Sequence, residues 1–309
     1  MDYIKGMTWG WVGKRGDWNT NSATDSMEKM KELGVNWTAI AFAGLQDTAQ
    51  STEINFTENP VVTDKEVYWA IAKAKELKLK VVLKPVVNVK DGTWRAHINF
   101  FDLDVPCEPK WSDWFKNYEL FILHYAKIAE ETNCEMFCIG CEMVQTDRRE
   151  KEWRELVRKV REVYSGPITY NCDKYQEDQV KWWDAVDIIS SSGYYPDDSW
   201  DYHEERIEKI VKKWNKPFFF METGCPSRKG SSKVPNDWDL NKGQIDLDEQ
   251  DHFYKQMFKV FNRQDWFYGF MLWDWPARLY QKEDAYKNDD YCVYGKPAAK
   301  TIESFFFTK

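Results

Sequence analysis

Short apolar runs alternate with helical patterns along the whole chain, and this alternation is the feature that most limits the possible folds. Strands are predicted at residues 3–9, 36–42, 80–85, 135–142, 168–171, 187–192, 216–222 and 268–273. Helices are predicted between them, for example at residues 63–77, 111–132, 176–183 and 203–214. Alternating elements force parallel pairing with right-handed crossovers. Eight such units in 309 residues predict an α/β fold, a single (β/α)8 TIM barrel, as one domain over residues 1–309.

An open, doubly wound sheet is the main alternative to the barrel. Its nucleotide site needs a G-x-G-x-x-G turn directly after the first strand. The chain has Gly10-Trp11-Val12-Gly13 there instead, which lacks that spacing. The closed barrel is therefore preferred, with Pro85 expected to end the pairing of the third strand.

Charge and hydropathy limit the possible partners. The net charge is −8, and acidic and basic residues are interleaved without a basic stripe, which argues against a nucleic-acid partner. No apolar run reaches membrane-spanning length, and the N-terminus lacks the pattern of a signal peptide. We expect no membrane partner and a cytoplasmic protein, or a secreted one if a leader has been removed. Nothing in the sequence indicates the oligomeric state.

Cysteine and histidine spacings give no sign of a metal or cofactor site. The seven cysteines are scattered, which favours free thiols in a reducing compartment. Cys138 and Cys141 form a C-x-x-C, but residues three apart in a strand are expected to point to opposite faces, which disfavours zinc or redox chemistry. The four histidines show no metal-binding spacing, so no metal and no cofactor are expected.

Two predicted strands end in a carboxylate, where burial gives no packing reason for one. Glu142 closes the fourth strand and Glu222 closes the seventh. A barrel carries its active site at the C-terminal ends of its strands, so both side chains are expected at one mouth. Two carboxylates on either side of a bond are what glycoside hydrolysis requires. The plainer interpretation of each glutamate is a helix cap or a salt bridge, for which Lys84 is available.

Motifs at six strand ends resemble those of glycoside hydrolase family 113, and the resemblance covers essentially the whole chain. The motifs are Gly6-Met7-Thr8-Trp9-Gly10-Trp11, Lys84-Pro85, Gly140-Cys141-Glu142, Tyr194-Tyr195-Pro196, Met221-Glu222-Thr223-Gly224 and Trp273-Asp274-Trp275. The family belongs to the clan A retaining barrel hydrolases, and its typical activity is that of an endo-acting β-1,4-mannanase. The resemblance implies hydrolysis of mannan, glucomannan or mannooligosaccharides by double displacement.

The resemblance also implies roles for individual residues. Glu142 matches the general acid/base, Glu222 the nucleophile, and Trp273 the aromatic floor under the reacting sugar. Either Tyr194 or Tyr195 matches the tyrosine that hydrogen-bonds the nucleophile. Many clan A enzymes place Asn before the acid/base to hold the sugar 2-hydroxyl, whereas this chain has Cys141. That contact is then expected from one of the residues Lys84, Asn88 and Asn171.

The 17 tryptophans fit a carbohydrate substrate, because indole planes stack on the flat C–H faces of pyranose rings. Stacking residues are expected in loops and at strand ends, with ordinary packing as the alternative at each position. The candidates are Trp9, Trp11, Trp94, Trp238 and Trp275. Trp94 lies in a long loop, residues 87–109, of a length that is usually functional.

Three other functions stay open at this point. Another retaining β-glycosidase, acting on glucan or xylan, would use the same two acids. A non-catalytic carbohydrate-binding barrel would bind oligosaccharide without turnover. A lyase that forms a Schiff base through Lys84 is a third possibility, although a lysine that binds a sugar hydroxyl is the simpler interpretation.

Overall fold

Eight parallel strands close into a barrel in the computed structural model, which describes residues 2–11, 13–238, 243–261 and 264–309. Strand order follows the sequence, and β1 pairs with both β2 and β8. The prediction of a (β/α)8 barrel is confirmed. The strands are β1 Ile4–Trp9, β2 Trp37–Gln46, β3 Lys80–Val89, β4 Met136–Cys141, β5 Ile168–Cys172, β6 Ile188–Ser192, β7 Phe218–Thr223 and β8 Phe267–Trp275.

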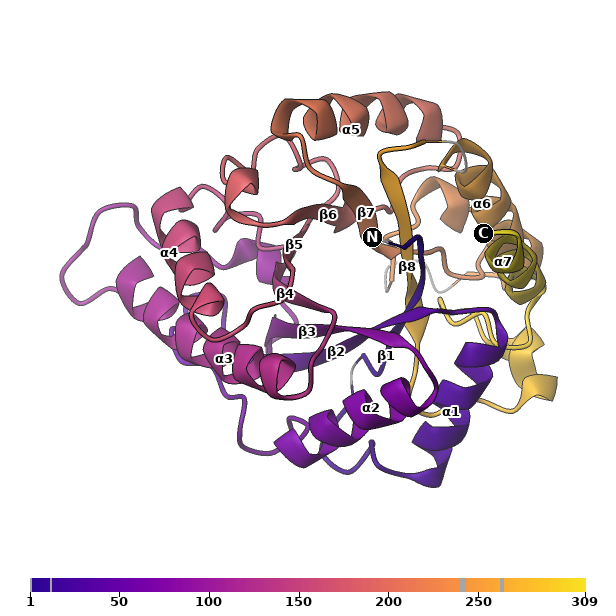
Figure 1. The fold of residues 1–309 in the computed structure, drawn as a ribbon, viewed down its shortest axis with the longest axis horizontal. Coiled ribbons are helices and arrows are strands. Elements are labelled where there is room, and N and C mark those ends of the chain that lie inside the picture. The colour runs from indigo at the N-terminus through magenta and orange to yellow at the C-terminus, as the bar shows by residue number, and fades with distance from the viewer. Residues whose placement is uncertain (1, 12, 239–242, 262–263) are drawn as a thin grey trace.

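Helices surround the strands as an outer ring (Figure 1). They are α1 Asn21–Glu32, α2 Asp64–Glu76, α3 Trp111–Glu131, α4 Glu150–Arg161, α5 Trp200–Trp214, α6 Leu247–Phe261 and α7 Pro297–Thr308, with 3-10 turns η1 Arg95–His97, η2 Trp183–Ala185, η3 Ser231–Lys233 and η4 Lys282–Lys287. Of the described helices, none is long and apolar enough to cross a membrane.

The helix predicted over residues 176–183 is absent, and β5 and β6 are joined by a loop with the turn η2. The apolar residues there pack as single anchors and do not form a helical stripe. Trp182 and Trp183 are fully buried, and their indole N–H groups donate to the carbonyls of Asp147 and Glu177 at 3.1 and 2.8 Å. Buried indoles need such partners, and here one comes from the loop itself and the other from the segment between β4 and α4.

Local signals explain where several elements begin. Thr63 caps α2 in a capping box with Glu66, as its sequence pattern predicts, and Pro297 occupies the first turn of α7.

Pro85 does not end the pairing of β3, because its Cα partner is Phe42 on β2. The ladder between β3 and β4 holds only Val82 and Leu83, so the β4 side of β3 tolerates a residue without an N–H.

Two apolar layers hold the barrel together. The larger layer fills the space between strands and helices, and the smaller one fills the barrel interior. The interior layer consists of Ile4, Trp37, Ala39, Val82, Met136, Cys138, Ile188, Phe219, Met221 and Met271, each at most 5% exposed. Above it, toward the C-terminal ends of the strands, the buried interior residues become polar, beginning with Lys84 and Asn171.

Gly269→Ala should destabilise the barrel where β8 closes on β1. A Cβ at Gly269 would lie 2.1 Å from the carbonyl oxygen of Ile4, at a φ of 119°. We expect a loss of about 3 kcal/mol from the clash and the strained backbone, visible as a lower midpoint of thermal unfolding. Gly16→Ala is the matched control, because φ is 94° there and no atom lies within 4 Å of the added carbon. Equal losses in both variants would contradict the clash.

Candidate active site

Glu222 lies in β7 at the C-terminal mouth of the barrel, surrounded by donors from three other strands or their ends. Lys84 of β3 forms a buried ion pair with its Oε1, and the Cys141 thiol of β4 donates to the same oxygen at 3.2 Å. The hydroxyl of Tyr194, just after β6, donates to Oε2 at 3.0 Å. Lys84 also donates to Oδ1 of Asn171 on β5 at 3.0 Å. The partners of the Glu222 carboxylate in this ring thus come from β3, the end of β4 and the segment just after β6.

Glu142 directly follows β4 and has its own set of donors. Arg95 Nη1 and Trp94 Nε1 donate to its Oε2 at 2.9 and 3.2 Å. Ser192, at the end of β6, donates to Oε1 at 2.7 Å. Glu142 has a φ of 52°, in the left-handed region that costs a non-glycine residue about 1 kcal/mol. The donors around the carboxylate help to hold this conformation at the mouth.

The two carboxylates converge on one point. A carboxylate oxygen of Glu142, one of Glu222 and the sulfur of Cys141 lie within 4.8 Å of one another. Both glutamates are buried, with 7% and 5% of their surface exposed. Charged groups that are buried together need compensation, and each carboxyl group has a cation beside it, Arg95 at Glu142 and Lys84 at Glu222.

Electrostatics keep Glu222 ionised and its neighbour Tyr194 protonated. Burial by itself would raise the pKa of Glu222, but the charge and hydrogen bond of Lys84, followed by the charge of Arg95, hold it below its ordinary value. Burial and the nearby charge of Glu222 raise the pKa of Tyr194 well above its ordinary value, so its hydroxyl keeps its proton. The ionised Glu222 carboxylate therefore accepts hydrogen bonds from the side chains that surround it.

Irregular strand register aims these side chains inward. The pairing of β4 with β5 shifts between Cys138 and Cys141, and the pairing of β7 with its neighbours shifts around Glu222. Met221 and Glu222 are consecutive, yet both face the barrel interior. Bulges that redirect a side chain are common beside active sites. The same shift turns Cys138 and Cys141 toward one interior, so the prediction that they point to opposite faces is wrong.

Three of the predicted tryptophans gather at the mouth. Trp11 and Trp273 contact each other with ring centroids 5.6 Å apart, and Lys84 Nζ lies 5.7 Å from the Trp273 centroid. The Arg95 guanidinium lies 5.5 Å from the ring of Trp11, and Trp94 reaches Glu142 while 39% exposed. These indoles surround the two carboxylates and leave aromatic surface available to a ligand.

Trp9 and Trp275 were expected to stack on the substrate, and these predictions are wrong. Trp9 and Trp275 are fully buried and donate to Ser26 of α1, at 3.3 Å to its hydroxyl and 2.9 Å to its carbonyl. The register of β1 with β8 slips by one residue between Met7 and Trp9, and both indoles then face the helices.

Tyr195 points away from the mouth because neighbouring residues of an extended chain face opposite sides. Its ring stacks on His203 of α5 at 3.8 Å, and its hydroxyl donates to the buried carboxylate of Glu177. Arg206 pairs with the same carboxylate at 2.9 Å. Tyr194 is therefore the tyrosine that contacts Glu222.

The remaining predicted residues differ in whether they lie beside the two glutamates. Asn171 is fully buried and belongs to the ring of donors and acceptors beside Glu222. Asn88 lies four residues after Lys84 on the same face of β3 and is half-buried. Trp238 is 66% exposed in the loop after β7, where its carbonyl accepts from Arg228 at 3.3 Å. Among the described residues, no contact places the Trp238 indole beside the two glutamates.

Of the donors to Glu142, sequence reasoning proposed Trp94 as a site residue but missed Arg95 and Ser192. Arg95 was visible only as one polar residue in a long loop, and Ser192 as the end of a strand. Ser190, Ser191 and Ser192 are three consecutive polar residues in a buried strand, which is the signal that pointed to an interior polar role. Lys84 is no candidate for a Schiff base here, because its ion pair with Glu222 keeps the amine protonated.

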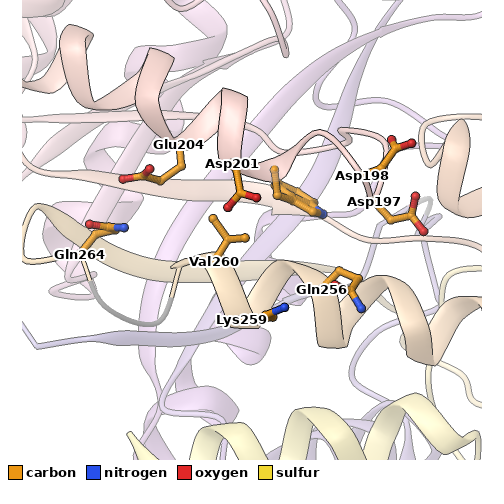
Figure 2. Close-up of a pocket in the computed structure, with 9 residues that line it drawn as sticks. Asp197, Asp198, Asp201, Glu204, Gln256, Lys259, Val260 and Gln264 are labelled. Atoms are coloured by element: carbon orange, nitrogen blue, oxygen red, sulfur yellow. The ribbon is translucent and has the colours of Figure 1, made fainter.

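A cavity of about 370 Å³ lies elsewhere, between α5 and α6 (Figure 2). Its wall carries four carboxylates against one lysine, and neither glutamate of the mouth takes part. Lys233 already pairs with Asp197 and Asp198 at 2.6 and 2.9 Å. The cavity is thus separate from the site described above.

A closed (β/α)8 barrel with two buried carboxylates and a set of indoles at its C-terminal mouth has the features of a barrel glycoside hydrolase. The model of glycoside hydrolase family 113 matches residues 7–296, and the chain belongs to this family.

Solved structures agree with the family assignment. Two structures of a GH113 β-1,4-mannanase, one of them a complex, share 52% and 53% identity with this chain over the full length of both chains, each with a TM-score of 0.98. A GH113 β-mannanase from Alicyclobacillus acidocaldarius, in complex with ManMIm, shares 43% identity over 100% of this chain and 98% of that chain, with a TM-score of 0.97.

More distant matches show the fold alone. A β-D-glucuronidase from Dictyoglomus thermophilum is 15% identical, with a TM-score of 0.67, and this chain spans 51% of it. The comparison with curated proteins found no match.

Tyr194→Phe and Tyr195→Phe should separate the two tyrosines. Tyr194→Phe removes a hydrogen bond to the charged Glu222, so we expect the rate of glycosidic hydrolysis to fall about 10-fold to 100-fold. Tyr195→Phe leaves the buried Glu177 with one donor fewer, so unfolding should become easier by about 1–3 kcal/mol while the rate stays close to wild type. Steady-state kinetics and thermal unfolding measure both effects. A larger rate loss in Tyr195→Phe would contradict the assignment.

Proposed function

We propose that the protein is a retaining endo-β-1,4-mannanase that hydrolyses mannan, glucomannan or mannooligosaccharides by double displacement. The observation that carries the mechanism is the convergence of Glu142 and Glu222, whose oxygens lie within 4.8 Å of a common partner and of each other. Retaining enzymes place their carboxyl groups about 5–5.5 Å apart, whereas inverting enzymes need roughly 6.5–9.5 Å to admit a water. The family relatives, two described as a β-1,4-mannanase and one as a β-mannanase, support the substrate.

In the first step, the Glu222 carboxylate attacks the anomeric carbon and the glycosidic C–O bond breaks. Glu142 gives its proton to the departing oxygen, and a glycosyl ester on Glu222 remains. In the second step, Glu142 removes a proton from water, the water oxygen bonds to the anomeric carbon, and the ester breaks. Lys84 and Tyr194 keep Glu222 ionised and oriented for the attack.

Lys84 is the best candidate to hold the sugar 2-hydroxyl. Both N–H groups of Asn171 are already used, one on Ser192 at 3.0 Å and one on the Cys172 carbonyl at 3.1 Å. An ammonium has three donors, and Lys84 spends two of them, on Glu222 and Asn171. Its third N–H remains for a hydroxyl of the reacting sugar.

Sugar release from a panel of mannan, β-glucan and xylan tests the substrate. We expect turnover of the mannans, with the anomeric proton of the first product showing retention by NMR. Faster turnover of glucan or xylan would point to the other retaining β-glycosidases. Oligosaccharide binding without turnover would identify a non-catalytic binding barrel.

Replacing either glutamate by Ala should reveal its role through azide rescue. With an aryl β-mannoside, Glu142→Ala still forms the glycosyl ester, which azide opens to a β-mannosyl azide. Glu222→Ala leaves space below the sugar, so azide attacks directly and gives the α-mannosyl azide. Without azide we expect losses of at least about 100-fold. Identical azide products from the two variants would contradict the assigned roles.

Lys84→Met should shift the acidic limb of the pH–rate profile to higher pH. Glu222 must be ionised to attack, and without the Lys84 charge its burial raises its pKa. The variant therefore loses activity first at low pH, as Glu222 becomes protonated. Lys90→Met is the control, because Lys90 pairs with Asp47 at an exposed position just beyond β3. An unchanged acidic limb in Lys84→Met would contradict this role.

A further inference from the structure

Asp173 is a buried carboxylate with an unused oxygen, and the mechanism above gives it no role. It directly follows β5, and only 6% of its surface is exposed. Its Oδ1 is shielded from solvent and has no hydrogen-bond partner within the described structure. Lys174 Nζ lies 3.7 Å away, within ion-pair range but beyond hydrogen-bonding distance. A buried acceptor left open is costly, so a missing donor is the natural explanation.

This oxygen belongs to the mouth of the barrel. Asp173 is two residues beyond Asn171, which faces the interior beside Lys84, and alternate residues of an extended chain share a face. The backbone N–H of Glu142 donates to the carbonyl of Asn171 at 2.8 Å, so the two chain segments run side by side. Burial and then the nearby charge of Glu142 raise the pKa of Asp173 to about 8.

Asp173, Lys174 and Trp94 form a continuous group on the Glu142 side of the site. Lys174 Nζ lies 5.8 Å from the centroid of the Trp94 ring, and the Trp94 indole donates to Glu142. The group thus combines an exposed aromatic face, a cationic donor and a carboxyl group with an acceptor oxygen around one glutamate. An indole plane flanked by polar groups suits a sugar ring, with its apolar face and its hydroxyls.

We propose that Asp173 and Lys174 bind hydroxyls of the leaving-group sugar while that sugar stacks on Trp94. The Asp173 carboxyl group accepts from one hydroxyl, and Lys174 donates to another. This inference rests on the proposed function, because Glu142 marks the leaving-group side only as the acid/base. Asp173 and Lys174 then favour substrates whose leaving group is a sugar. An aryl leaving group has no such hydroxyls, so its departure does not depend on these two residues.

Two substrates with different leaving groups test the inference. For Asp173→Ala we expect kcat/KM on mannotetraose to fall about 10-fold to 100-fold, because a hydrogen bond to a polar buried group is lost. On 4-nitrophenyl β-mannobioside the same variant should stay within about 3-fold of wild type. Asp173→Asn keeps an acceptor and should recover most of the mannotetraose rate. Both rates are measured on one preparation, so partial unfolding lowers them equally and leaves their ratio unchanged.

Asp147→Asn is the matched control. Asp147 is also buried with one unused oxygen, but it accepts from Tyr170 within the outer layer. Its substitution should leave the ratio of the two rates unchanged. Equal losses on both substrates, or no loss, in Asp173→Ala would overturn the inference alone. Wild-type protein that cleaves neither substrate would overturn the proposed function, and the inference with it.

Discussion

The pairing of two buried carboxylates with two buried cations is the interaction on which this site depends. Glu142 and Glu222 are buried close together inside the barrel, and each carboxyl group has a cation beside it, Arg95 for Glu142 and Lys84 for Glu222. Removing one member of such a pair leaves an uncompensated charge, so the four side chains form a unit. They come from four places in the chain, and only a closed barrel brings these together. The fold and the charge balance thus require each other.

The tryptophans serve two purposes, and the direction in which each indole points decides which purpose it serves. Indoles that face the helices are anchors whose N–H groups bond to backbone or serine, as Trp9 and Trp275 do with α1. Indoles at the mouth point into the space around the glutamates, as Trp11, Trp94 and Trp273 do. Sequence position alone did not separate the two groups, because a one-residue slip in register decides which face a strand-end residue takes.

Features set by local pattern were predictable from the sequence, and features set by register were not. The alternation of apolar runs with helical stripes predicted the barrel, and the strand-end positions of Glu142 and Glu222 predicted their convergence. The helix expected over residues 176–183 failed because two tryptophans there are anchors in a loop. The bulges that place Cys141 and Glu222 inside have no sequence signature, since they result from how neighbouring strands pair. The role of Arg95 had no sequence signal either, because its partner Glu142 lies elsewhere in the chain, and Ser192 was marked only by the polar run that ends its buried strand.

The apolar layer that fills the lower barrel has a consequence for the order of events. Its side chains fill the interior below the two glutamates, so a ligand reaches these residues from the mouth. In the proposed double displacement, the water that releases the bound sugar then arrives from the side that the departing fragment has just vacated. A fragment that stays there would delay hydrolysis and offer its own hydroxyl in place of water. Under that mechanism, the balance between cleaving chains and re-joining them depends on how tightly this side of the mouth retains a sugar.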